Sequence, residues 1–320
     1  MLNAFPRALT EGLSLSSRNL ADQTWVDLVS PTEAERSAFE RATGLSVPSE
    51  NELGEIEATS RLQVKNDALY MTAPLTFAAG NEPWLPAPVG FVLSKRLLMT
   101  VRLATSVAFD TVAKEMSAAE KSDPTTVFAR LLEELIDHLA DLLEAAGRDL
   151  DDASHTIFRP DQQKHLSRET AMLRQLMIST GRTSERMARI HYTLVCLDRM
   201  TKFTTDRAAD WLKPDMAARL QSISSDAVSL VHFSEGLVSR VQLLQDAAIG
   251  IINSDQNEVI KVLTIASVVG IPPVMIAGIY GMNFKTIHEY DWAWGYQWAL
   301  ALIVISALVP LIWFKWKHWI

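Results

Sequence analysis

The side chains of this chain that could do chemistry carry oxygen rather than sulfur or clustered imidazole. Four carboxylates, Glu133, Asp137, Asp141 and Glu144, recur at spacings of four, four and three residues, so a helix would place them on one face. Such a face could gather cations, although an ordinary solvated helix surface has the same pattern. The seven histidines are scattered, Cys196 is the single cysteine, and no glycine-rich phosphate-binding loop is present, so nothing indicates an enzyme.

A second group of polar residues lies in the C-terminal part of the chain, which contains long stretches without charged residues. Residues 262–284 and 292–314 are two stretches of 23 residues without Asp, Glu, Lys, Arg or His. About 20 apolar residues cross a bilayer as a helix, so both stretches are predicted membrane spans. Small or polar residues lie mostly on one broad face of the first: Asn257, Thr264, Ser267, Gly270, Gly278 and Asn283. Small residues also serve dry helix packing in membranes.

Two spans cannot by themselves enclose a water-filled path. Either the chain is only anchored in the membrane, or several copies assemble around an axis. Lys261 precedes the first span and Lys315 and Lys317 follow the second, which predicts that the large N-terminal part and the C-terminal tail face the cytoplasm. The N-terminus shows no signal-peptide pattern. With 30 basic and 38 acidic residues the net charge is −8, which does not favour nucleic acid as a partner.

The elements that must position these residues divide into three segments. Residues 1–155 are predicted as a cytoplasmic α/β sandwich of the α+β class, residues 156–260 as a helical stalk and residues 261–320 as the transmembrane region. The transmembrane region is predicted to have spans near 262–282 and 293–314 and an outer loop at 283–292. The β-prone runs of the first segment are 24–29, 56–64, 68–75, 89–93 and 97–101, with a turn at 80–83.

Helices are predicted from Pro31, from Pro124 to about Ala146 with Gly147 beyond it, from His165 to about Trp211, and from Asp215 to Tyr280. The last would be roughly 100 Å long at 1.5 Å per residue. Apolar residues at steps of three and four predict a packing seam along it: Leu230, Phe233, Leu237, Val241, Leu244, Ala248 and Ile251.

The end of the first span carries a recognisable motif. Tyr280-Gly281-Met282-Asn283-Phe284 stands a few residues before the second span. The sequence Asn253-Ser254-Asp255-Gln256-Asn257-Glu258-Val259-Ile260-Lys261-Val262 approaches the membrane, Pro272-Pro273 lies within the span, and the tail reads Trp313-Phe314-Lys315-Trp316-Lys317-His318-Trp319-Ile320. Together these segments resemble the CorA family of magnesium channels, most closely its enteric-bacterial branch. The likeness is sharp from about Asp226 onward and looser over residues 20–160.

The resemblance implies a funnel-shaped homopentamer in the bacterial inner membrane, in which the first span of each subunit lines the pore. It implies uptake of Mg²⁺, and also of Co²⁺ and Ni²⁺, driven by the membrane potential, with no organic cofactor. Gly281, Met282 and Asn283 would form the selective mouth, where Asn283 holds hydrated Mg²⁺. The gate would fall at Ile260 and Leu263, with Ile271 farther up; Asn257, Ser267, Val274 and Gly278 would line the rest.

The resemblance also assigns the outer loop and a regulatory site. Glu289 and Asp291 would attract cations, although the loop reads Ile287-His288-Glu289-Tyr290 where the family commonly has Met-Pro-Glu-Leu. Asp226 matches an acidic stalk residue, and with the acidic face at 133–144 it is the candidate sensor of intracellular Mg²⁺. Two alternatives stay open: a zinc transporter of the ZntB type, against which Met282 argues, and a membrane-anchored scaffold or signalling protein that transports nothing.

Overall fold

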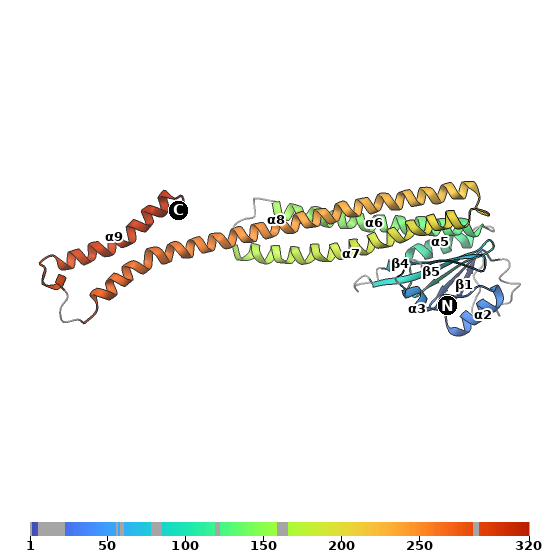
Figure 1. The fold of residues 1–320 in the computed structure, drawn as a ribbon, viewed down its shortest axis with the longest axis horizontal. Helices are drawn as coiled ribbons and strands as arrows, with labels where there is room; N and C mark the ends of the chain where they lie inside the picture. Colours follow the sequence, from blue (N-terminus) through green and yellow to red (C-terminus); the bar gives the residue numbers. More distant parts are fainter. Residues whose placement is uncertain are drawn as a thin grey trace. The chain divides into compact units, whose positions relative to one another are not determined.

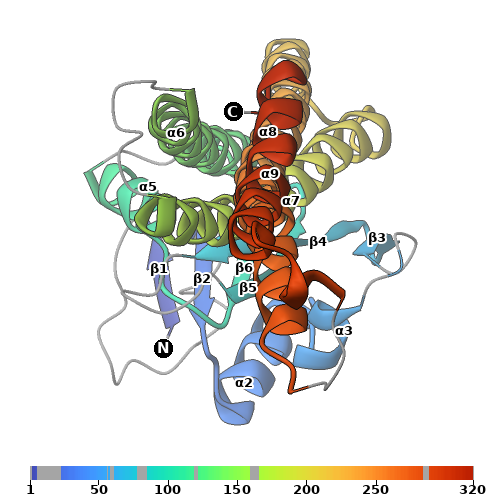
Figure 2. The same cartoon turned by 90° about the vertical axis from the view of Figure 1, so that its left-hand side faces the viewer.

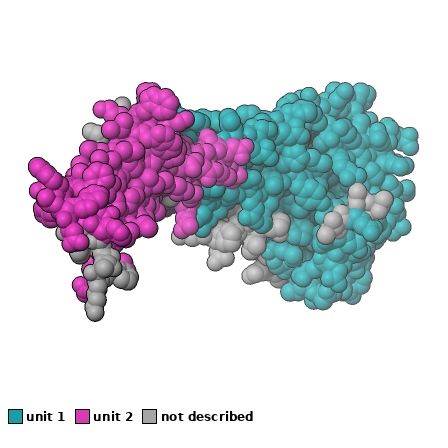
Figure 3. Space-filling view, turned by 60° about the vertical axis from the view of Figure 1, so that its left-hand side comes forward, with its two compact units in different colours: residues 1–159, 176–244 teal, residues 160–175, 245–320 magenta. Residues whose placement is uncertain are grey.

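The computed structural model describes residues 2–5, 23–55, 57, 61–77, 85–118, 122–158, 166–283 and 288–319 of the chain. These residues form two compact units (Figure 3). The first comprises residues 1–159 and 176–244, and the second comprises residues 160–175 and 245–320. The predicted division at residues 155 and 260 stays a prediction.

The first unit is built on a six-stranded mixed sheet (Figure 2). The strands are β1 (Leu2–Phe5), β2 (Trp25–Val29), β3 (Leu62–Lys65), β4 (Ala68–Phe77), β5 (Leu85–Leu93) and β6 (Leu98–Arg102). Their order is β1-β2-β6-β5-β4-β3, and β2 pairs parallel with β6 while the other neighbours pair antiparallel. Long central strands give the unit a sheet that is apolar on both faces, which requires a cover of helices on each side.

Helices cover both faces of this sheet (Figure 1). Helices α2 (Glu33–Thr43) and α3 (Glu50–Gly54) lie on one face, where Phe39 and Leu53 join a buried cluster with Val26 and Met99. Helices α5 (Val107–Ala118) and α6 (Pro124–Phe158) lie on the other face, where Phe91 packs against aromatic rings of both helices. The predicted α/β sandwich is therefore confirmed.

The strands β2 and β6 also bury one ion pair. Asp27 and Arg102 are 2% and 3% exposed, and their closest charged atoms are 2.8 Å apart. Thr100 donates to the same carboxylate at 2.7 Å, and Arg102 lies over the ring of Phe109. Each polar group of this network has a partner, as burial of charge requires.

Three long helices and a short link complete the chain. They are α7 (Leu166–Arg207), α8 (Pro214–Tyr280), the 3₁₀ turn η2 (His288–Asp291) and α9 (Gly295–Trp316). The 67 residues of α8 form one helix, as predicted, although it contains Pro272 and Pro273. Both α8 and α9 contain apolar stretches long enough to cross a membrane. The predicted C-terminal pair of apolar helices is thus confirmed.

Several predicted element bounds were wrong. Helix α6 continues past Gly147 to Phe158, and α7 ends at Arg207 rather than near Trp211. Residues 62–64 of the predicted run 56–64 belong to β3, residues 56 and 58–60 lie outside the described residues, and the structure adds β1, α3 and α5, which the sequence did not predict. The predicted turn at 80–83 lies outside the described residues. In the predicted seam of α8, Leu237, Val241, Leu244 and Ala248 are buried, whereas Phe233 is 47% exposed.

Candidate functional site

The residues predicted to line a pore all lie on α8. They follow one another at steps of three or four residues, and because α8 is helical throughout, this spacing places them on one side of it. Their apolar members are open to the surroundings in the single chain: Ile260 is 59%, Leu263 66%, Ile271 62% and Val274 72% exposed. Asn257 and Gly278 are also exposed, and Ser267 is half-buried. Such a face is available to other copies of the helix.

The hydroxyl groups of this stretch are already satisfied within α8. Thr264 donates to the carbonyl of Ile260 at 2.7 Å, and Ser267 donates to that of Leu263 at 2.8 Å. In a membrane these bonds remove two polar hydrogens that would otherwise lack water. The oxygens keep free lone pairs, so each hydroxyl can still accept a hydrogen bond from an ion's hydration water.

The predicted mouth residues follow the C-terminal end of α8. The N–H of Gly281 bonds to the carbonyl of Ala277 at 2.9 Å, and that of Met282 bonds to Ile279 at 3.2 Å. A side chain on Gly281 would stand 3.2 Å from the Ala277 oxygen, so the last turn is closely wound there. Asn283 is exposed beside these carbonyls. A helix C-terminus carries partial negative charge, which favours a cation at this place.

The link between the two apolar helices also carries carboxylates. Glu289 and Asp291 belong to the single turn η2, and neither forms an ion pair in the described part of the chain. Gly295 is buried where α9 begins, and a Cβ there would overlap the carbonyl oxygen of Glu289. The absence of a side chain at residue 295 is therefore what lets η2 fold back onto α9.

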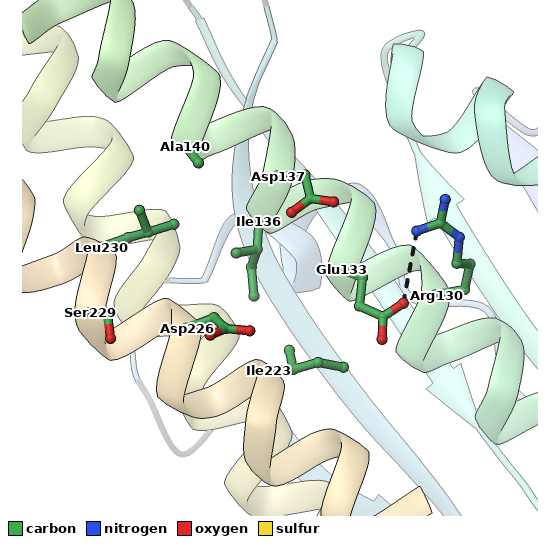
Figure 4. A pocket seen from close by; sticks show the side chains of 9 residues that line it. All are labelled: Arg130, Glu133, Ile136, Asp137, Ala140, Ile223, Asp226, Ser229 and Leu230. Atoms are coloured by element: carbon green, nitrogen blue, oxygen red, sulfur yellow. Dashed lines mark ion pairs between the residues drawn. The ribbon is translucent and has the colours of Figure 1, made fainter.

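Three of the five carboxylates predicted as regulatory line a cavity of about 460 Å³ between α6 and α8 (Figure 4). Asp137 and Glu133 on α6 line it together with Asp226 on α8, over a floor that includes Ile136 and Ile223. Asp137 and Asp226 are exposed and form no hydrogen bond or ion pair within the described ranges. Two unneutralised carboxylates thus face a common space from separate helices.

Glu133 has a different role from its neighbours. Arg219 donates to its two oxygens at 2.6 Å each, and Arg130 lies 3.8 Å away. These bonds raise the pKa of the Arg219 guanidinium and fasten α8 to α6. Glu144 pairs with Arg148 at 3.8 Å, and Asp141 is exposed and does not line the cavity. The predicted four-carboxylate face is therefore not one site.

The sequence did not single out Arg219 and Arg130, because a partner 86 residues away leaves no local pattern. The described residues contain no group of three or more His, Cys, Asp or Glu side chains arranged to hold a metal ion. The donor set of the cavity fits Mg²⁺ only as a hydrated ion, which one or two carboxylates can hold through its retained waters.

An α/β unit followed by one long helix and a second apolar helix defines a class of membrane protein with two C-terminal spans. The family described as CorA-like Mg²⁺ transporter protein matches residues 21–316, and the chain belongs to that family. The members of this family are transporters rather than enzymes.

Similar proteins cover nearly the whole chain. The magnesium transport protein CorA of Yersinia pseudotuberculosis is 30% identical over 95% of this chain and 94% of its own, and that of Salmonella typhimurium is 29% identical over 100% of both. The complete structure of the CorA magnesium transporter from Methanocaldococcus jannaschii has a TM-score of 0.74 at 17% identity, covering 92% of this chain and 91% of its own. At that identity the structure supports the fold alone.

Proposed function

We propose that this chain forms a homopentameric channel that takes up hydrated Mg²⁺ across the cytoplasmic membrane, with α8 lining the pore. The observation that carries the proposal is Gly281-Met282-Asn283 at the end of an apolar helix, in a chain that belongs to the CorA-like family. Co²⁺ and Ni²⁺ are proposed as further substrates. The N- and C-termini lie in the cytoplasm, and the flanking lysines support this orientation.

The amide of Asn283 suits an ion that keeps its water. Mg²⁺ demands octahedral oxygen coordination and dehydrates reluctantly. A ring of Asn283 amides, with the last carbonyls of α8 beside them, accepts hydrogen bonds from these waters without replacing them. A carboxylate ring would bind more tightly and release the ion more slowly, and conduction requires weak binding. Glu289 and Asp291 raise the cation concentration outside this mouth.

The apolar positions farther along α8 supply the gate. Rings of Ile260 and Leu263, with Ile271 farther up, close the path by excluding water. Entry needs no ATP, because two charges crossing 100 mV gain about 4.6 kcal/mol. The membrane potential therefore drives the entry of the ion, and the protein only has to open the gate.

Growth of a magnesium-transport-deficient bacterium tests the proposal. The intact chain restores growth at low magnesium, and Asn283→Ala abolishes the rescue at equal membrane expression. Ser306→Ala, which alters a polar residue of α9 instead, is the matched control and keeps the rescue. Failure of the intact chain to rescue growth contradicts the proposal. Zinc-dependent rather than magnesium-dependent flux selects the zinc transporter, and an equal lack of rescue and of flux by native chain and Asn283→Ala selects a non-transporting protein.

We further propose that the cavity between α6 and α8 senses intracellular Mg²⁺. A hydrated ion between Asp137 and Asp226 neutralises two carboxylates that otherwise repel each other across separate helices. Asp226 and Ile260 both belong to α8, so the proposed sensor residue and the proposed gate residue are parts of one helix.

Flux measurements in proteoliposomes test the sensor. We expect the double variant Asp137→Asn/Asp226→Asn to need a several-fold higher internal Mg²⁺ concentration for inhibition than the native protein. Asp141→Asn removes a carboxylate from the same helix outside the cavity, so its inhibition should match that of the native protein. Equal inhibition of all three proteins would contradict the sensor while leaving the transport proposal intact.

A further inference from the structure

Arg61 is a buried cation whose partners among the described residues are all neutral. It lies just before β3 and is 9% exposed. Its Nε donates to the carbonyl of Glu55 at 2.5 Å, and its Nη1 donates to the Tyr192 hydroxyl at 2.6 Å and lies 3.8 Å from Cys196 Sγ. Burial raises the pKa of the Cys196 thiol, opposed by the nearby Arg61, so this group is uncharged at pH 7.

The third nitrogen of the Arg61 guanidinium, Nη2, has no hydrogen-bond acceptor among the described residues. Arg61 also forms no ion pair within the part of the chain that the structure describes. Arginine stays charged and has five N–H donors. Burial of a charge is costly unless an opposite charge compensates it. The described residues therefore hold a positive charge here without an ion-pair partner for it.

A second arginine lines the same place. Arg61 and Arg199 border a cavity of about 50 Å³ between the start of β3 and α7, with Thr72, Tyr192 and Cys196 on its wall. Arg199 is exposed and has no hydrogen bond or ion pair among the described residues. None of the lining residues in the described ranges is acidic. Two guanidiniums without an ion pair in the described residues, and two hydroxyls, thus surround one cavity as hydrogen-bond donors. This local positive charge stands out because the net charge of the chain is −8.

We propose that this cavity binds a tetrahedral oxyanion, either inorganic phosphate or the terminal phosphoryl group of a larger ligand. The planar fork of a guanidinium matches two oxygens of such an anion, and the bonds are strengthened by charge on both sides. One water needs roughly 10–15 Å³ of such space, so the cavity has room for a few oxygen-sized atoms and not for a nucleotide. The bound anion joins the segment before β3 to α7.

Cys196 provides a direct reporter, because it is the only cysteine of the chain and lies on the cavity wall. The full-length protein in detergent is alkylated with iodoacetate, which is anionic, and with neutral iodoacetamide. We expect the rate ratio of iodoacetate to iodoacetamide to be several-fold higher than for a free cysteine derivative. Inorganic phosphate at constant ionic strength should slow both reactions saturably, which separates occupancy from salt screening.

Two variants test the arginines separately. Arg61→Gln and Arg199→Gln should each lower the rate ratio toward that of the free thiol and weaken protection by phosphate. Arg199 is exposed, so its replacement leaves a folded protein even where Arg61→Gln does not. Arg182→Gln removes an exposed charge from the same helix outside the cavity and should change nothing.

The outcomes also separate the two sources of the anion. Protection by phosphate at lower concentration than by ATP in EDTA identifies a free oxyanion, and the reverse order identifies a phosphoryl group on a larger ligand. A native rate ratio equal to that of the free thiol, with no protection by phosphate or ATP, overturns the proposal. The transport proposal does not depend on this result.

Discussion

At the scale of single residues, Arg102 contacts two carboxylates that differ in burial and in contact distance. Asp27 is fully enclosed, whereas the side chain of Asp110 is 58% exposed and lies 3.6 Å from the same guanidinium. We expect Asp27→Ala to lower the free energy of unfolding by about 3–5 kcal/mol, because it leaves a buried charge without its partner. Asp110→Ala should cost only about 0–1 kcal/mol. Denaturant unfolding followed by circular dichroism compares the variants, and equal losses would contradict this account.

The candidate site residues differ in how far the sequence alone could single them out, for physical reasons. Gly281, Met282 and Asn283 could be named from the sequence, because a motif at the end of an uncharged span is local information. Asp226 and Asp137 could be named as candidates, but their meeting in one cavity depends on the packing of α8 against α6. In the sequence, Glu133 and Asp137 are equivalent carboxylates. In the structure, Arg219, which is 86 residues away, neutralises Glu133 and leaves Asp137 unpaired within the described residues.

At the scale of elements, the wrong bounds have identifiable causes. Gly147 predicts a helix end, yet it lies within α6, at a point where a Cβ would stand 3.8 Å from the Leu237 side chain of α8. Burial of Leu150 and Ile157 beyond it outweighs the roughly 1 kcal/mol that an interior glycine costs. In β5, Pro86 and Pro88 pair with β4 alone, because β6 joins β5 only from Val89.

The start of α2 gives a prediction with a definite pH dependence. The Glu35 carboxylate accepts the N–H of Thr32 at 2.8 Å, and this bond lowers the pKa of Glu35 against the opposing effect of burial. Its stabilisation is fully present above the unfolded pKa of about 4.3 and is lost as the pH falls through the lower folded value. We expect Glu35→Gln to cost about 0.5–1 kcal/mol at pH 7 and nothing once the pH is below both values.

The control for this prediction is Glu33→Gln in the same first turn, where the side chain is 91% exposed. Thermal unfolding of the three full-length proteins across the acidic range measures the effect. A difference between Glu35→Gln and the native chain that persists unchanged at the lowest pH would show that the charge is not its source.

At the scale of the whole molecule, a single chain leaves the apolar stretches of α8 and α9 almost entirely uncovered. None of the apolar window of α8 is buried within the single chain, and only 6% of that of α9 is buried. Two helices cannot surround water, so a path for ions requires further copies of α8 about an axis. The same helix carries Asp226, so in the proposed assembly each copy of α8 would carry the proposed sensor residue as well as the proposed pore-lining residues.

Cysteine cross-linking decides which side of α8 faces the other copies. In a Cys196→Ser background, Leu263→Cys and Val262→Cys are neighbours in sequence with nearly equal exposure, 66% and 63%. Successive residues differ by about 100° around a helix, and only residue 263 lies on the side that carries Ile260 and Ile271. We expect oxidation in native membranes to give disulfide-linked dimers rapidly with Leu263→Cys and much more slowly with Val262→Cys. A preference for residue 262 would place the pore on the opposite side of α8, and no cross-linking at either position would contradict assembly around this helix.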